Sequence, residues 1–249
     1  MIERALTPDK EGIGIGMSGI SDNIKRIREQ IEKAALISGR SGGDIKLVAA
    51  AKMNGTAEVR EAIASGVDAV GENRVQELLE KHAQDAYSGA PLHFIGHLQT
   101  NKVKSVVGKC ELIESVGSLR LLDELERHAK IAGVRQDVLI EVNIGEKESK
   151  SGVKPQELDS LLASCAEKSS IIVRGLMAIP PILPEKGVNR TFFDMMQKLF
   201  VDILGKKYDN VYMQYLSMGM SDSFCEAIEC GANMVRVGTA IFGARYYVN

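Results

Sequence analysis

Lys52 is the residue in this sequence best placed to do covalent chemistry. It follows the apolar run Leu47–Ala51, which is typical of a strand buried on both faces. An ammonium group at the end of such a strand is costly to desolvate unless it pairs with an anion or loses its proton. A lysine with a lowered pKa is a nucleophile that can form a Schiff base with an aldehyde. The alternative is a strand-end lysine whose charge simply extends into solvent.

Two segments near the end of the chain have the composition of an anion-binding site. Residues 217–221 contain two hydroxyls, one of them on Ser217, and Gly219, which allows backbone N–H groups to approach a ligand. Residues 237–243 contain Gly238, the hydroxyl of Thr239 and the free N–H groups of a short helix. Either segment alone could be an ordinary loop with a helix cap. Their occurrence together favours a phosphate site.

Eight strand–helix units are predicted along the chain. With mostly short connections and no break in composition, they indicate a single (β/α)8 barrel, a TIM barrel of the α/β class. A doubly wound open sheet usually has a Gly-rich turn after its first strand, whereas Lys-Met-Asn-Gly follows the first strand here. The strands are expected at 47–51, 67–71, 92–96, 112–116, 138–143, 171–177, 211–216 and 234–237, after an extra N-terminal helix at about 23–37.

Active residues of such a barrel gather at the carboxyl ends of the strands, and the loops after the seventh and eighth strands commonly bind phosphate. The candidates at these ends are Lys52, Asn73, His97, Asn143, Met177, Ser217 and Arg236. A phosphate site facing a lysine suits pyridoxal phosphate, because the aldehyde needs an amine and the phosphate needs hydrogen-bond donors. Arg236 would then lie near the pyridine nitrogen, keep it unprotonated and weaken the ring as an electron sink.

Composition excludes several other classes of function. The formal net charge of −2 gives no electrostatic case for binding nucleic acid or an anionic membrane. Four cysteines without C-x-x-C spacing favour a reducing cytoplasm. His93 and His97 have an H-x-x-x-H spacing, but no nearby cysteine or carboxylate completes a ligand set, so no metal is predicted. Residues 1–18 are expected to be a flexible leader, and residues 19–249 the barrel.

Several motifs together resemble the pyridoxal phosphate homeostasis proteins, a family of single-domain barrels similar to the N-terminal domain of alanine racemase. The resemblance covers residues 21–245, and its motifs are Ala49-Ala-Ala-Lys52, Gly71-Glu-Asn73, His93-Phe-Ile-Gly-His-Leu-Gln-Thr-Asn-Lys102, Gly175-Leu-Met177, Ser217-Met-Gly-Met-Ser-Asp222 and Val235-Arg-Val-Gly-Thr-Ala-Ile-Phe-Gly-Ala-Arg245. The family more often has Gln-Val-Asn in the fifth strand, where this chain has Glu141-Val-Asn143.

The resemblance also implies roles for individual residues. Lys52 would be the Schiff-base lysine, and Asn73 would lie beside the ring. Arg236 would be at the pyridine nitrogen. The phosphate would be held by Ser217, Gly238 and Thr239.

Three functions are compatible with these features. The resemblance implies a cytoplasmic carrier of pyridoxal 5'-phosphate, expected to be a monomer, with apo enzymes that use the cofactor as candidate recipients. A racemase would need a second acid/base, which in alanine racemase is a tyrosine delivered with the help of a further domain; this chain ends at Asn249, and Tyr246 and Tyr247 are weak candidates. A barrel that binds another phosphorylated metabolite would use Lys52 only to neutralise charge. We therefore expect cofactor carriage without substantial turnover.

Overall fold

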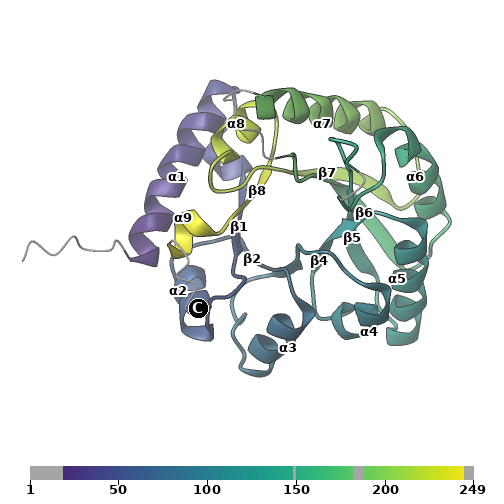
Figure 1. Cartoon of the computed structure of the whole chain (residues 1–249), viewed down its shortest axis with the longest axis horizontal. Helices are drawn as coiled ribbons and strands as arrows, with labels where there is room; N and C mark the ends of the chain where they lie inside the picture. Colours follow the sequence, from purple (N-terminus) through teal and green to yellow (C-terminus); the bar gives the residue numbers. More distant parts are fainter. Residues whose placement is uncertain (1–18, 148–149, 182–187, 244–249) are drawn as a thin grey trace, which may run out of the picture.

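Eight parallel strands form a closed barrel in which each strand pairs with its neighbours in sequence, and β8 pairs with β1 (Figure 1). The computed structural model describes residues 19–147, 150–181 and 188–243. The strands are β1 Lys46–Ala50, β2 Ala69–Glu72, β3 Leu92–Phe94, β4 Leu112–Val116, β5 Gln136–Glu141, β6 Ile171–Met177, β7 Val211–Ser217 and β8 Met234–Val237. The predicted (β/α)8 barrel is confirmed.

Helices surround the barrel, and α1 is the extra N-terminal helix expected from the sequence (Figure 1). The α-helices are α1 Ile20–Ile37, α2 Thr56–Ala64, α3 Val75–Ala83, α4 Val103–Val106, α5 Leu119–Ala132, α6 Leu158–Ala166, α7 Val188–Leu204, α8 Phe224–Glu229 and α9 Thr239–Phe242. Short 3-10 turns are found at Gly42–Asp44, Thr100–Lys102 and Pro155–Glu157. Among the helices so described, none is long and apolar enough to cross a membrane.

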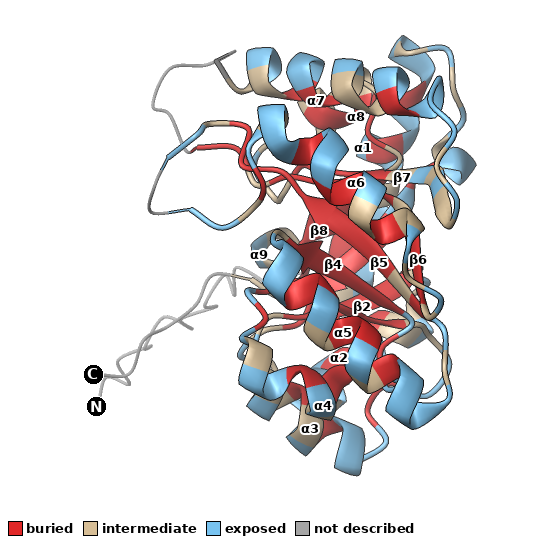
Figure 2. Ribbon diagram, turned by 90° about the vertical axis from the view of Figure 1, so that its right-hand side faces the viewer, coloured by how far each residue is buried: buried red, intermediate tan, exposed pale blue. Residues whose placement is uncertain are grey.

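Seven of the eight strands are largely buried because apolar residues pack against both of their faces (Figure 2). The exception is β7, in which Tyr212 and Gln214 are exposed. Inside the barrel is a small cluster made of Val48, Ala69, Leu112, Leu139, Met177 and Met234. A much larger cluster fills the space between the strands and the helices. It includes Leu47, Ala49 and Ala51, which alternate along the chain with residues that face the inside of the barrel, such as Val48. This two-layer packing explains why the strands appear in the sequence as continuous apolar runs.

The helix α1 and the residues just after it contact the last segments of the barrel, around β8. The Nδ2 atom of Asn23 donates a hydrogen bond to the backbone oxygen of Ile241 at 2.8 Å. The Nη1 atom of Arg40, just after the helix, donates to the backbone oxygen of Ala232 at 2.9 Å. These contacts tie the beginning of the barrel to the segments around β8.

Two strand ends differ from the sequence prediction in ways that affect the site. The strand β1 ends at Ala50, so Lys52 lies in the turn that follows it. The strand β5 ends at Glu141, two residues earlier than predicted. The reason is that Asn143 belongs to the following loop, where its Nδ2 atom donates to the backbone oxygen of Lys147 at 2.8 Å. The predicted leader, residues 1–18, lies outside the described residues.

Candidate functional site at the carboxyl ends of the strands

Lys52 lies half-buried in a tight turn between β1 and α2. The preceding residue, Ala51, is fully buried, and its N–H donates to the backbone oxygen of Gly71 on β2 at 2.9 Å. The following residue, Met53, has a φ of 64°, in the left-handed region that non-glycine residues rarely adopt. The position of Lys52 is therefore fixed by a buried residue on one side and by an unusual backbone conformation on the other.

Arg236 enters the barrel from β8, the strand beside β1. It is only 4% exposed. Its Nη2 atom donates to the backbone oxygen of Ala178 at 2.9 Å, and its Nη1 atom donates to the hydroxyl of Ser217. Burial lowers the pKa of Arg236, an effect that the carboxylates of Glu114 and Glu141 oppose. The guanidinium is thus held in one orientation below the mouth of the barrel.

Ser217 belongs to the same buried cluster as Arg236. It is fully buried at the end of β7, and its hydroxyl donates to Oε2 of Glu114 at 2.6 Å. The other oxygen of Glu114 lies 2.8 Å from Nδ1 of His93. Burial alone would raise the pKa of Glu114, but His93, Arg236 and the Ser217 hydroxyl together lower it. The carboxylate of Glu114 is therefore the centre of a charged cluster that orients Arg236.

Ser221, which carries the second hydroxyl of the predicted anion-binding segment 217–221, connects this segment to the one at 237–243. Its Oγ atom accepts hydrogen bonds from the N–H groups of Gly238 at 3.3 Å and Ala240 at 3.2 Å. Both bonds use acceptor lone pairs, so the hydroxyl proton of Ser221 remains available for a ligand. Thr239 lies between these two amides and is exposed. The contact that distinguishes Ser221 from Ser217 joins segments that are apart in the sequence, so no local pattern shows it.

Two glycines allow the close packing of this region. Gly219 has a φ of 93°, and a Cβ atom there would lie 2.6 Å from Cβ of Ala227 on α8. A Cβ atom on Gly238 would lie 3.1 Å from the backbone oxygen of Ala50, two residues before Lys52. The Gly238–Thr239 segment therefore lies directly beside the end of β1.

Asn73 follows β2, the other neighbour of β1, and is partly buried. Its Oδ1 atom is buried and has no hydrogen-bond partner within the described ranges. Leaving a buried amide oxygen without a hydrogen-bond donor costs free energy, and a ligand or a water molecule can supply the donor. Asn73 is thus a predicted site residue with an unpaired buried oxygen, and it follows the strand next to β1.

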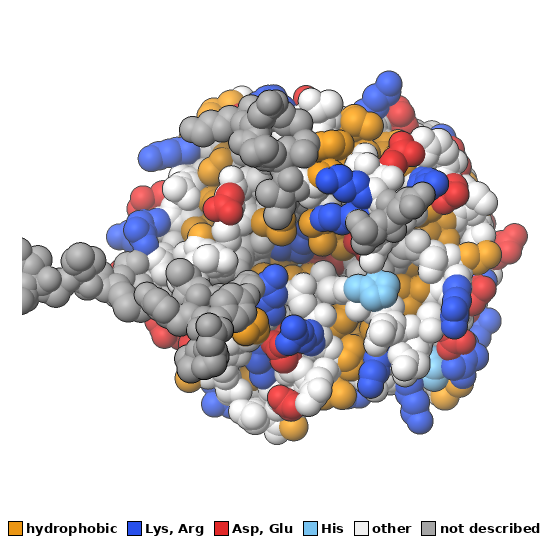
Figure 3. All heavy atoms as spheres, viewed as in Figure 1, with side chains coloured by type: hydrophobic (Ala, Val, Ile, Leu, Met, Phe, Trp, Pro, Cys, Tyr) orange, Lys and Arg blue, Asp and Glu red, His pale blue; other side chains and the backbone are white. Residues whose placement is uncertain are grey.

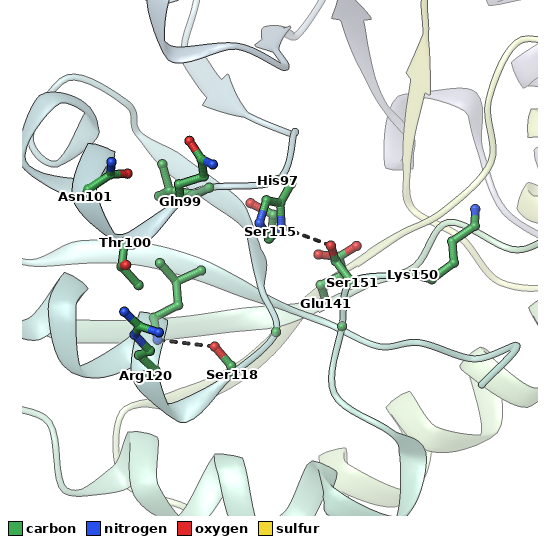
Figure 4. A pocket seen from close by; sticks show the side chains of 14 residues that line it. His97, Gln99, Thr100, Asn101, Ser115, Ser118, Arg120, Glu141, Lys150 and Ser151 are labelled. Atoms are coloured by element: carbon green, nitrogen blue, oxygen red, sulfur yellow. Dashed lines mark hydrogen bonds between the residues drawn. The ribbon is translucent and has the colours of Figure 1, made fainter. Parts of the chain in front are cut away.

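A cavity of about 530 Å³ opens on the other side of the mouth, between the loops that follow β3, β4 and β5 (Figure 4). Arg120 and Lys150 lie at opposite sides of this cavity, and Ser151 contacts Nδ1 of His97 at 2.9 Å. Glu141 forms part of the lining, and burial raises its pKa to about 7 although Arg236 and Lys150 favour its charged form. Lysine and arginine side chains gather around the opening on this face of the molecule (Figure 3).

The fold brings some of the sequence-predicted residues together and separates others. Lys52 follows β1, and Arg236 and the Gly238–Thr239 segment lie on and after β8, the strand paired with β1; Asn73 follows the adjacent strand β2. His97 lies across the mouth in the cavity, and Met177 packs inside the barrel. Tyr246 and Tyr247 lie outside the described residues. Within the described part of the chain, no group of three or more His, Cys, Asp or Glu residues could hold a metal ion.

Comparison with known proteins gives consistent matches over almost the whole chain. Residues 16–246 match the family described as the alanine racemase N-terminal domain. A pyridoxal phosphate homeostasis protein of Aquifex aeolicus is 42% identical over 226 residues, which cover 91% of this chain and 98% of the relative. The protein of the same name in Escherichia coli K12 is 39% identical over 236 residues, covering 93% of this chain and 99% of that protein.

A solved structure extends this similarity to the fold. The protein PipY of Synechococcus elongatus, solved with pyridoxal phosphate bound, superimposes with a TM-score of 0.77 at 28% identity. The match covers 90% of this chain and all of PipY.

Proposed function

Because this chain belongs to the family of pyridoxal phosphate homeostasis proteins, we propose that it binds pyridoxal 5'-phosphate on Lys52 and carries the cofactor without substantial turnover. One observation carries the proposal. Barrel closure places a half-buried lysine, a buried arginine and a glycine-threonine segment at the ends of two adjacent strands, β1 and β8. Amine, fixed cation and phosphate donors are the groups that this cofactor needs.

The residues present fit the cofactor. The group supplies an aldehyde, which condenses with a primary amine and releases water; we assign the amine to Lys52. We assign Gly219, Gly238 and Thr239 to the phosphate region, and we add Ser221 because its hydroxyl proton is available there. We assign the sequence-predicted Ser217 to orienting Arg236, because its hydroxyl is bonded to Glu114 and Arg236. The unpaired Oδ1 atom of Asn73 supports its assignment beside the ring.

The position of Arg236 supports carriage rather than catalysis. Its guanidinium is held by Ser217, Glu114 and the backbone of Ala178, so it is a fixed donor that keeps its charge. A charged donor assigned to the pyridine nitrogen leaves that nitrogen unprotonated, which weakens the ring as an electron sink. We therefore propose that the protein stores and releases the cofactor in the cytoplasm as a monomer, and that apo enzymes which use the cofactor are its recipients.

The test is covalent trapping on the purified protein. We expect loaded protein treated with borohydride to carry a mass adduct on Lys52, and Lys52→Ala to lose both the adduct and the cofactor absorbance while remaining folded. Lys102→Ala, a change of an exposed lysine in the loop after β3, is the matched control and should keep both. An adduct found mainly on Lys102 or Lys150 would contradict the assignment.

The same preparations distinguish a carrier from a racemase. A carrier should leave the α-hydrogen of alanine and of other amino acids unexchanged in deuterium oxide. Rapid exchange with inversion, lost in Lys52→Ala, would show that the protein is an enzyme.

A further inference from the structure

The helix α3 contacts the turn that carries Lys52 at the residues on both sides of it. The Nζ atom of Lys81 donates to the backbone oxygen of Ala51 at 2.9 Å. The Oε2 atom of Glu77 accepts a hydrogen bond from the N–H of Met53 at 2.7 Å. Residues 77 and 81 are four apart and therefore lie on one face of the helix. Lys52 is the residue between these two contacts, which we call the α3 clamp.

The Lys81 side of the clamp is a buried ion pair. Lys81 is 7% exposed, and its Nζ atom lies 2.6 Å from Oε1 of the fully buried Glu72. The hydroxyl of Tyr87 donates to the same oxygen at 3.1 Å. Burying two charges in this way adds little to stability compared with well-packed apolar residues, because both charges lose their hydration. What the pair does provide is a fixed direction for the Lys81 ammonium group, toward the backbone oxygen of Ala51.

The Lys81–Glu72 ion pair is also adjacent in the chain to Asn73, a second candidate site residue. Glu72 is the last residue of β2 and directly precedes Asn73. One buried cluster therefore holds the residue before Lys52 and the residue before Asn73.

The Glu77 side of the clamp holds a strained residue. The left-handed conformation of Met53 is unfavourable for a non-glycine residue and persists only where the surroundings impose it. The carboxylate of Glu77 binds the N–H of this residue, and it also lies 4.0 Å from Nζ of Lys81. Glu77 therefore links the strained turn to the buried ion pair.

We propose that Glu77 and Lys81 are positioning residues for Lys52. They fix the backbone of Met53 and Ala51, the residues on either side of Lys52, and so determine where the Lys52 amine can react with an aldehyde. The inference rests on the proposed function. In the covalent step, a C=N bond between Nζ of Lys52 and the aldehyde carbon would replace the C=O bond, and the oxygen would leave as water with the two protons of the neutral amine. The clamp residues act on this step through the backbone of Ala51 and Met53. The phosphate-binding segments after β7 and β8 are not part of the clamp.

The test separates the rate of the covalent step from the affinity for the rest of the cofactor. The variants are Glu77→Ala, Glu77→Gln as the conservative replacement that keeps an acceptor, and Lys81→Met combined with Glu72→Gln, which removes both buried charges together. Glu80→Ala is the matched control, because Glu80 is an exposed residue of α3 that bonds only Gln76 among the described residues. The two ligands are pyridoxal phosphate and 4-deoxypyridoxine 5'-phosphate, which keeps the ring and the phosphate but lacks the aldehyde.

We expect adduct formation on Lys52 to slow by roughly ten- to a hundredfold in Glu77→Ala and in the double variant, because small misplacements of reacting groups have effects of this size. Glu77→Gln should form the adduct at close to the parent rate, and the control Glu80→Ala should form it at the parent rate. The dissociation constant of the deoxy analogue should stay at the parent value in Glu77→Ala, Glu77→Gln and Glu80→Ala. In the double variant, which also changes the residue before Asn73, it should change by much less than the rate.

Two results would overturn the inference. One is adduct formation at the parent rate in Glu77→Ala and in the double variant. The other is an equal loss of rate and of analogue affinity, which would show general damage to the barrel. If the parent protein itself forms no adduct on Lys52, the proposed function fails, and the clamp inference fails with it.

Discussion

Two serines four residues apart, Ser217 and Ser221, have different surroundings and therefore different expected roles. The hydroxyl of Ser217 is fully buried between Glu114 and Arg236. The hydroxyl of Ser221 accepts from the amides on either side of Thr239 and keeps its proton for another acceptor. At the scale of single residues, the first serine orients the arginine and the second belongs with the phosphate-binding segment.

We predict that Thr239→Ala and Ser221→Ala each weaken binding of pyridoxal phosphate by about one to two powers of ten, since a charge-assisted hydrogen bond is worth roughly 1.5–3 kcal/mol. Binding of pyridoxal, which lacks the phosphate, should be nearly unaffected. Ser217→Ala should weaken both ligands by the same factor, because it acts through Arg236. Spectroscopic titration with both ligands checks this, and a loss confined to the phosphorylated ligand would instead make Ser217 a phosphate ligand.

Glu141 is a second residue whose environment determines its behaviour. Burial raises its pKa to about 7, above the ordinary carboxyl value of 4.5. The folded protein therefore binds more protons than the unfolded chain between these two values, so this group costs stability as the pH rises through that range. A glutamine at this position would carry no such cost, because its side chain does not ionise.

We predict that Glu141→Gln increases the free energy of unfolding at pH 8 by up to roughly 3 kcal/mol, the equivalent of the pKa shift, and changes it little near pH 4.5. Urea unfolding of the ligand-free protein across this range provides the measurement. Glu111→Gln, an exposed change just before β4, is the control and should follow the parent curve. Parallel curves for Glu141→Gln and the parent would contradict the prediction.

At the scale of elements, the loops at the carboxyl ends position the site by packing backbone against backbone. A Cβ atom on Gly96, after β3, would lie 2.1 Å from the backbone oxygen of Asn73. Gly96, in the loop after β3, therefore packs directly against the backbone of Asn73. On the other side of Asn73, the α3 clamp holds the turn of Lys52. Asn73 is therefore held by a neighbouring loop, and Lys52 by side chains of the helix α3.

We predict that Gly96→Ala destabilises the protein by about 1–3 kcal/mol through overpacking and also weakens cofactor binding, because the backbone of Asn73 must move. Thermal unfolding and cofactor titration check the two effects. Gly205→Ala is the control, since the nearest atom to a new Cβ there is 3.6 Å away, an ordinary contact. Unchanged cofactor affinity in Gly96→Ala would show that Asn73 does not contact the ligand.

At the scale of the whole molecule, the site depends on closure of the barrel. Pairing of β8 with β1 places Arg236 beside Val48, although the two residues are far apart in the sequence. Asn23 and Arg40 reinforce this closure by binding the backbone of Ile241 and Ala232. The lysine and its proposed phosphate-binding segment therefore come together only in the fully folded protein.

The sequence alone predicted the barrel and the family, which are confirmed, and it also predicted Lys52 and the two anion-binding segments, which remain predictions. Apolar runs and helix periodicity are local properties, and they predicted the eight strands with small errors at their ends. Lys52, Gly238 and Thr239 could be selected because strand ends are functional positions in a barrel.

Only the tertiary structure decided how the side chains around these positions are arranged. Glu77 and Lys81 look like ordinary surface charges of a helix in the sequence, yet one binds the turn of Lys52 and the other is buried against Glu72. The contact of Ser221 with the amides of Gly238 and Ala240 depends on how two separate segments pack, and the pKa of Glu141 depends on its burial. Burial, charge and side-chain direction are set by contacts between distant segments, and a local sequence pattern carries no information about those contacts.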